Sequence, residues 1–167
     1  MSDPYAPPAA ETEIDIDELA GRWRRLFGAL IDNLIISGVI AWGLMFATGL
    51  WDAALAGTAT FMDQLPVFVG SFVIHMLVQA YPLATRGQTI GKMAVGTQIV
   101  SVETDEILPL GTVIGLRYLP VSVAGMIPLI GFILVIVDAL FIFREDKRCV
   151  HDLIAKTKVV MYEKGEA

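Results

Sequence analysis

Four polar or charged side chains interrupt the long apolar stretches of this chain: Asp32, Gln79, Arg117 and Asp138. An ionisable group at the centre of a lipid bilayer costs at least about 2.5–3.5 kcal/mol, so it needs a partner or a function. Along a helix, each of the four lies roughly 9–10 Å from the inferred cytoplasmic end of its own segment. We therefore expect all four side chains at one depth, in the inner half of a membrane.

Two kinds of chemistry fit this arrangement. One is structural, with Arg117 in a buried ion pair with Asp32 or Asp138 that locks the helices together. The other is transport, in which a carboxylate exchanges a proton for a cation on a path through the membrane. Arg25 and Asp32 recur at helical spacing and share one face of the first segment. From the residues alone the structural interpretation is favoured, because intramembrane ion pairs often do only that.

A candidate polar pathway consists of His75, Gln79 and Asn33. His75 lies about 16 Å from Arg86, near the middle of the membrane, and one helical turn from Gln79. Histidine titrates near physiological pH and could relay a proton. A lone histidine more often donates a hydrogen bond to a neighbouring helix, and that alternative stays open.

Other chemical motifs fail on their spacing. The stretch Gly87–Lys92 resembles a phosphate-binding loop, but it has three residues between its glycines and Met93 where the magnesium-binding Ser or Thr belongs. His75 and His151 are the only histidines and lie on different segments, so we predict no metal site. The single cysteine, Cys149, has no thiol-protease pattern around it. No nucleophile–base pair is evident, so neither enzymatic activity nor a cofactor is expected.

The elements that must position these residues are membrane helices. The chain is 55% hydrophobic and only 18% charged, against about 25% charged residues in soluble domains. A membrane helix needs about 20 apolar residues, and the 36-residue run 108–143 is too long for one helix. We predict an all-α membrane protein with a bundle of about four transmembrane segments, the last two forming either full spans or a short re-entrant hairpin. The predicted segments are 26–50, 65–84, 110–126 and 129–143.

Basic residues define the orientation. The loop 51–64 has no Lys or Arg, whereas basic residues precede the first segment, follow the second and follow the last. The positive-inside rule then places both termini in the cytoplasm. The basic residues at 144–158 are expected to contact lipid headgroups, and no nucleic-acid binding is predicted.

The chain divides into three parts. Residues 1–20, which are acidic and contain three prolines, are predicted to be a disordered tail. Residues 21–160 form the membrane domain, and 161–167 form a C-terminal tail. Two stretches of β-type composition, 98–102 and 157–162, are expected to make a small cytoplasmic β element.

Three motifs, in this order and at these distances, resemble the RDD family of small bacterial membrane proteins. They are Arg24–Asp32, which begins Arg-Arg-Leu-Phe, then Gly87–Lys92, and finally Cys149–Val159 with its His-Asp pair. The resemblance covers the chain from about Gly21 to Val160. It implies a multi-pass protein of the bacterial inner membrane with a proposed role in transport, including cation/proton exchange for some members.

The family is named for one arginine and two aspartates. Arg25 and Asp32 match the first two, and Asp152 is a better match to the third than Asp138. One departure is Cys149-Val150 before the histidine, where the family commonly has a leucine. The resemblance also suggests that Asp152 caps a helix or pairs with Arg25 or Lys92.

Our leading hypothesis is a transporter that moves a small cation in exchange for protons. Asp32 would be the exchanging carboxylate, Arg25 and Arg117 would tune it electrostatically, and Asp138 would be a second carboxylate. About four segments are few for a transporter, so a homo-oligomer is expected. The alternative is a non-transporting accessory or assembly protein that binds a larger membrane complex.

Overall fold

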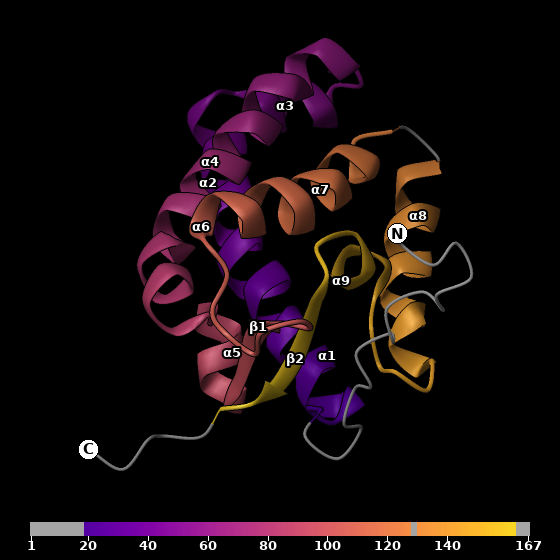
Figure 1. Cartoon of the computed structure of the whole chain (residues 1–167). Helices are drawn as coiled ribbons and strands as arrows, with labels where there is room; N and C mark the ends of the chain where they lie inside the picture. Colours follow the sequence, from indigo (N-terminus) through magenta and orange to yellow (C-terminus); the bar gives the residue numbers. More distant parts are fainter. Residues whose placement is uncertain (1–18, 128–129, 163–167) are drawn as a thin grey trace, which may run out of the picture.

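Two long helices dominate the structure, a computed structural model that describes residues 19–127 and 130–162 (Figure 1). The first runs over Arg22–Ala47 and the second over Phe61–Arg86; each has 26 residues and is apolar enough to cross a membrane. They correspond to the segments predicted at 26–50 and 65–84. The first helix has three parts, α1 (Arg22–Leu30), the π-helical η1 (Ile31–Ser37) and α2 (Gly38–Ala47), and the second is α4 (Phe61–Arg86).

Local sequence signals define the ends of these helices. The first helix stops at Ala47 because Gly49 adopts a left-handed conformation, with φ 73°, before α3 (Leu50–Leu55) begins. The second begins with a capping box between Thr60 and Asp63. Figure 1 shows α3 at one end of the long pair and the two strands near the other end.

The third and fourth predicted segments are helical but short. They are α6 (Leu110–Thr112), the π-helical η2 (Val113–Tyr118) and α7 (Leu119–Gly125), followed by α8 (Ile130–Leu140) and the 3₁₀ turn η3 (Phe141–Phe143). Each run has 10–17 residues, at most about 25 Å of helix, against about 30 Å of hydrocarbon. In the described part of the chain, two helices rather than four therefore have the length to span a membrane.

A small sheet closes the end of the long pair opposite α3, as the sequence predicted. Strand β1 (Thr97–Ser101) pairs antiparallel with β2 (Thr157–Met161) in the register Ile99↔Val159. The short helices α5 (Ile90–Val95) and α9 (Val150–Ile154) precede these two strands in the chain. The buried apolar core here brings together residues from several elements: Ala20, Leu83, Ile99, Val113 and Val159.

Three residues assigned to the predicted tails, Leu19, Ala20 and Met161, belong to the folded part of the chain. Leu19 forms a bridge with Val160, and the Ala20 N–H donates to the Val159 carbonyl, so both residues are buried against β2. Residues 1–18 and 163–167, where most of the predicted tails lie, are outside the described residues. Met161 belongs to β2 rather than to the C-terminal tail.

A glycine contact joins α1 to α5. A Cβ atom on Gly28 would lie 3.3 Å from the Gly91 carbonyl oxygen. A Cβ on Gly91 would overlap the Gly28 carbonyl oxygen and lie 2.7 Å from the Asp32 Cγ. The second glycine of the stretch 87–92 is therefore explained by close helix packing rather than by phosphate binding.

Replacing Gly91 with alanine should lower the free energy of unfolding by about 3 kcal/mol, because the obstacle is backbone that cannot rotate away. Gly43→Ala is the matched control, since a Cβ there meets nothing within 4 Å, and its effect should stay below about 1 kcal/mol. Reversible unfolding in detergent micelles measures both. Equal effects of the two substitutions would contradict the proposed packing.

Candidate functional site

Asp152 is fully buried and lies between two buried arginines. Its Oδ2 accepts from Arg25 Nη2 at 2.5 Å and from the Cys149 backbone N–H at 3.1 Å. Its Oδ1 accepts from Arg117 Nη1 and, at 3.0 Å, from Thr157 Oγ1. We call these five residues the Asp152 cluster; they join the first helix, η2, α9 and β2.

The charges in this cluster determine the ionisation of its carboxylate. Burial by itself raises the pKa of Asp152, but the positive charges of Arg117, His151 and Arg25 outweigh it and hold that pKa well below its usual value. The carboxylate is therefore ionised. Removing one partner of such a buried pair is costly, because the remaining charge is left unpaired in a low-dielectric interior.

The arginine partners differ in part from the predicted ones. The expected pairing of Arg117 with Asp32 or Asp138 is wrong, since Arg117 binds Asp152. Counting residues along the helices placed Asp32, Arg117 and Asp138 at one depth in the membrane. It could not show that α9, which carries Asp152, folds back against η2. The suggested pairing of Arg25 with Asp152 is confirmed.

Asp138 lies in a different contact. Its Oδ1 accepts from the His151 backbone N–H at 2.9 Å, and its Oδ2 lies 2.6 Å from His151 Nδ1. The side chain therefore ties α8 to α9. The structure does not bring Asp138 together with Asp32 among the described contacts.

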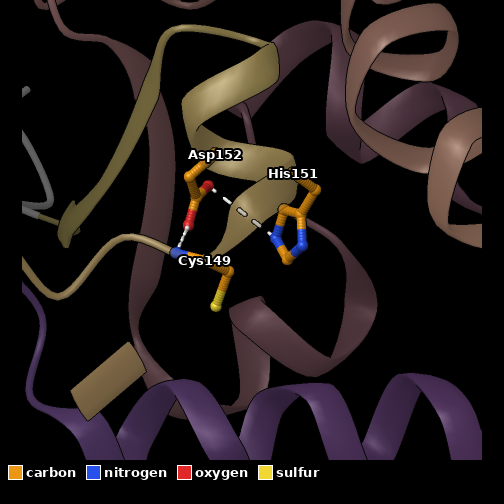
Figure 2. Close-up of side chains that lie close together, drawn as sticks. All are labelled: Cys149, His151 and Asp152. Atoms are coloured by element: carbon orange, nitrogen blue, oxygen red, sulfur yellow. Dashed lines mark hydrogen bonds and ion pairs between the residues drawn. The ribbon is translucent and has the colours of Figure 1, made fainter. Parts of the chain in front are cut away.

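Cys149, His151 and Asp152 also form a compact group, with their potential ligand atoms all within 4.8 Å of one another (Figure 2). The donor chemistry does not favour a metal ion. Both oxygens of Asp152 already bind guanidinium groups, and burial raises the pKa of the Cys149 thiol to about 11. The Cys149 sulfur points toward α1, where Arg25 Nη2 lies 3.8 Å away. We therefore interpret this group as an anchor for α9.

Asp32 has a different environment, made of neutral donors. Its Oδ1 accepts from Gln79 Nε2 at 2.9 Å and from the Gly91 N–H at 2.8 Å, and its Oδ2 accepts from Thr89 Oγ1 at 2.5 Å. Gln79 Oε1 in turn accepts from the Ile90 N–H at 2.8 Å. Among the described residues no Lys or Arg forms an ion pair with Asp32. We call Asp32, Gln79, Thr89, Ile90 and Gly91 the Asp32 cluster.

Thr89 and Gly91 were not among the predicted site residues. The sequence did hold a signal for them, because Thr89 is the N-cap of α5 and both lie in the Gly87–Lys92 stretch. The sequence predicted that this stretch is a family motif and not a phosphate-binding loop, but it did not predict a contact with Asp32. Its actual role is to present an N–H and a hydroxyl to a carboxylate on the first helix.

A row of polar side chains continues from Asp32 along α4. Ser71, His75 and Gln79 recur every four residues and so share one helical face. His75 Nδ1 lies 2.9 Å from Ser37 Oγ, which also donates to the Asp32 carbonyl. The buried Ser71 hydroxyl makes no hydrogen bond within the described residues. We call Ser71, His75 and Gln79, with Asp32 at the end, the polar row.

Asn33 does not belong to this row. Its side chain is exposed on another side of the helix and donates to the Ala29 carbonyl at 2.8 Å. Asp32 and Arg117 both lie within π-helical segments, η1 and η2, and Asn33 shares η1 with Asp32. Such segments are rare and are frequent at functional sites.

Lys92 is buried near both clusters, and within the described residues its ammonium group makes neither a hydrogen bond nor an ion pair. Burial lowers its pKa to about 8, with Arg117 and Arg25 lowering it further and Asp32 and Asp152 opposing them. The lysine is therefore sensitive to the charges of both carboxylates.

Comparison with known proteins places these residues in a family context. A model described as the RDD family matches residues 19–156. The chain is 32% identical to the uncharacterized protein YckC of Bacillus subtilis (strain 168), over 92% of this chain and 91% of that protein. It is 29% identical to the uncharacterized membrane protein YteJ of the same organism, over 90% of this chain and 85% of that protein. No solved structure matches it significantly.

Replacing Asp152 with asparagine should lower the free energy of unfolding by about 3–5 kcal/mol, because Arg25 and Arg117 then lose their buried counter-charge. Glu103→Gln is the control, since its 2.9 Å pair with Lys156 is exposed and should contribute less than about 1 kcal/mol. Unfolding in detergent micelles measures both. A loss of under 1 kcal/mol for Asp152→Asn would show that the cluster is not a structural clamp.

Stability should also depend on the titration of Lys92. Its folded pKa of about 8 is below the usual 10.5, so the unfolded chain binds more protons between these values and stability rises with pH across that window. Below pH 8 the charged lysine costs up to about 3 kcal/mol. The difference in unfolding free energy between wild type and Lys92→Met should therefore shift in favour of wild type from pH 8 to 10.5.

The control for this measurement is Lys156→Met, which changes an exposed lysine and should give a difference that is flat with pH. Cys149 acts in the opposite direction, because its raised pKa makes stability fall as pH increases through its own titration. It is present in every variant and cancels in the comparison. A flat difference for Lys92→Met would contradict the buried, pH-sensitive lysine.

Proposed function

We propose that this membrane protein, which belongs to the RDD family, moves a small cation across the bilayer in exchange for protons. Asp32 is the exchanging carboxylate in this proposal. The observation that carries it is the set of contacts of Asp32, a buried carboxylate held by neutral donors at the end of the polar row. The long apolar helices and the name of one relative, a membrane protein, support the membrane setting.

The distribution of arginines supports this role for Asp32. Arg25 and Arg117 are both engaged by Asp152, so neither neutralises Asp32 through an ion pair. The negative charge of Asp32 is therefore available to a proton or a small cation. Thr89 adds a hydroxyl oxygen beside it, and oxygen ligands suit hard cations. Gln79 holds the carboxylate through its amide N–H, while its own oxygen accepts from the Ile90 N–H.

The polar row supplies a route toward Asp32. Ser71 lies two helical turns beyond Gln79 on α4, nearer the end that carries α3, with His75 between them. A buried hydroxyl without a partner is a place where a water molecule would bind. Protons would pass through water and His75 to the carboxylate, since imidazole can both accept and donate near physiological pH.

Two long helices from one copy do not enclose a path by themselves, so the proposal includes a homo-oligomer. It also includes the bacterial inner membrane, with both termini in the cytoplasm, as the basic residues indicate. In this arrangement the Asp152 cluster holds the framework at the cytoplasmic end. Arg25 and Arg117 act on Asp32 through their field rather than by contact.

The test is ion-driven proton flux in proteoliposomes under imposed Na⁺, K⁺ and pH gradients. Wild type should produce flux, and Asp32→Asn should reduce it to the rate of empty liposomes while remaining folded, because the amide still accepts a hydrogen bond but cannot titrate. Asp52→Asn, an exposed carboxylate on α3, is the control and should keep the wild-type rate.

Two outcomes would overturn the transport proposal. One is no flux from folded, oriented wild type, which would favour the accessory or assembly function and direct the search to a partner complex. The other is wild-type flux from Asp32→Asn, which would place the exchanging group elsewhere.

A further inference from the structure

An apolar groove lies between the start of α1 and the end of α8. Trp23 and Leu26 line it on the first helix, and Ile136, Ala139 and Leu140 line it on α8. Its volume is about 250 Å³. Neither carboxylate cluster contributes to it, so the groove is separate from the site described above.

A fixed guanidinium group stands in this groove. Arg22 donates from Nε to the Ile142 carbonyl and from Nη2 to the Arg144 carbonyl, each at 3.2 Å. These bonds attach the side chain to the end of α8 and η3. They leave Nη1 without a hydrogen bond in the described part of the chain, so a donor remains for a ligand.

The position of the groove relative to the membrane follows from its ends. Arg22 is the first residue of the first apolar helix and Arg144 follows the last apolar segment, so both mark the surface of the bilayer. Ile136 lies eight residues before Arg144, about 12 Å deeper along a helix. The groove thus extends from the level of lipid headgroups into the level of acyl chains.

From this geometry we propose that the groove binds an anionic phospholipid, with one acyl chain between α1 and α8 and the phosphate on Arg22. Trp23 suits the same level, because tryptophan is enriched where headgroups meet hydrocarbon. The occupant is a lipid rather than a protein segment because an apolar slot and a single cationic group match its two parts. The inference does not depend on transport.

The headgroup must supply the selectivity. Acyl chains are as apolar as the groove wall, so moving one out of the bilayer gains little from the hydrophobic effect. Guanidinium groups bind phosphate oxygens through directed, charge-assisted hydrogen bonds. One basic residue near an anionic surface is worth about a fivefold preference.

The groove has other charged residues near its polar end. Arg144 is half exposed, lies over the Phe141 ring and pairs with Asp146 at 3.2 Å. Glu145 is exposed beside them. These two carboxylates offset Arg144, so Arg22 is the group expected to hold the phosphate.

The test compares lipids retained by the full chain after reconstitution with equal phosphatidylglycerol and phosphatidylethanolamine and mild detergent extraction. Native mass spectrometry should show about a fivefold excess of bound phosphatidylglycerol on wild type. Arg22→Gln should bind the two lipids equally. Arg24→Gln is the matched control, since it removes the same charge from an exposed arginine that faces α5 through the Val95 carbonyl, and it should keep the preference.

A second pair of variants tests the groove itself. Ala139→Trp should fill it and remove the retained lipid, whereas Val137→Trp, on α8 but outside the groove, should not. Thermal unfolding of each variant checks that it is folded; should Arg22→Gln unfold, Arg22→Lys keeps the charge and should retain a reduced preference.

Three results would overturn the proposal. The first is equal retention of both lipids by wild type. The second is the same loss of preference in Arg22→Gln and Arg24→Gln, which would mean general surface charge. The third is displacement of phosphatidylglycerol by inorganic phosphate with the acyl groove left empty, which would identify a free anion as the ligand.

Discussion

The placement of one carboxylate, Asp152, between two buried guanidinium groups is the constraint on which the rest of the structure depends. Arg25 comes from the first helix, Arg117 from η2 and Asp152 from α9, so this contact joins segments that are far apart in the chain. Two positive charges in an interior of low dielectric constant are unstable unless a negative charge and further hydrogen bonds compensate them. Thr157 supplies such a bond and connects the cluster to the sheet. Without the carboxylate, nothing would compensate these two positive charges where the segments meet.

Asp32 differs from Asp152 in the partners that surround it. Asp152 is held by cations that keep it ionised, whereas Asp32 is held by an amide, a hydroxyl and a backbone N–H. The first arrangement suits a permanent clamp, and the second suits a carboxylate whose charge can be neutralised by a mobile ion. Lys92, buried near both, couples the two clusters through its charge.

Close packing makes this arrangement possible. The contact of Gly28 with Gly91 brings α5 against α1 closely enough for the Gly91 N–H to reach Asp32. Within a membrane, every polar group needs a hydrogen-bond partner from the protein itself, because lipid offers no hydrogen bonds. Asp32 and Arg117 are buried within their π-helical segments, while the exposed apolar surface of the helices remains for lipid.

The sequence by itself determined the two long helices, the small sheet and the family. The pairing of Arg25 with Asp152 was one of the alternatives that the family resemblance suggested, and the structure selected it. Apolar run length, β-type composition and short motifs are local properties, so each can be recognised without knowing what it contacts. The sequence did not show that the helices ending in α7 and η3 are too short to span a membrane. It also did not identify Asp152 as the partner of Arg117. It also did not show that Thr89 and Gly91 bind Asp32. These features depend on how helices cross and on where α9 folds back. The tertiary structure alone decided them, because a hydrogen bond between groups 35 to 59 residues apart exists only once the chain between them has folded.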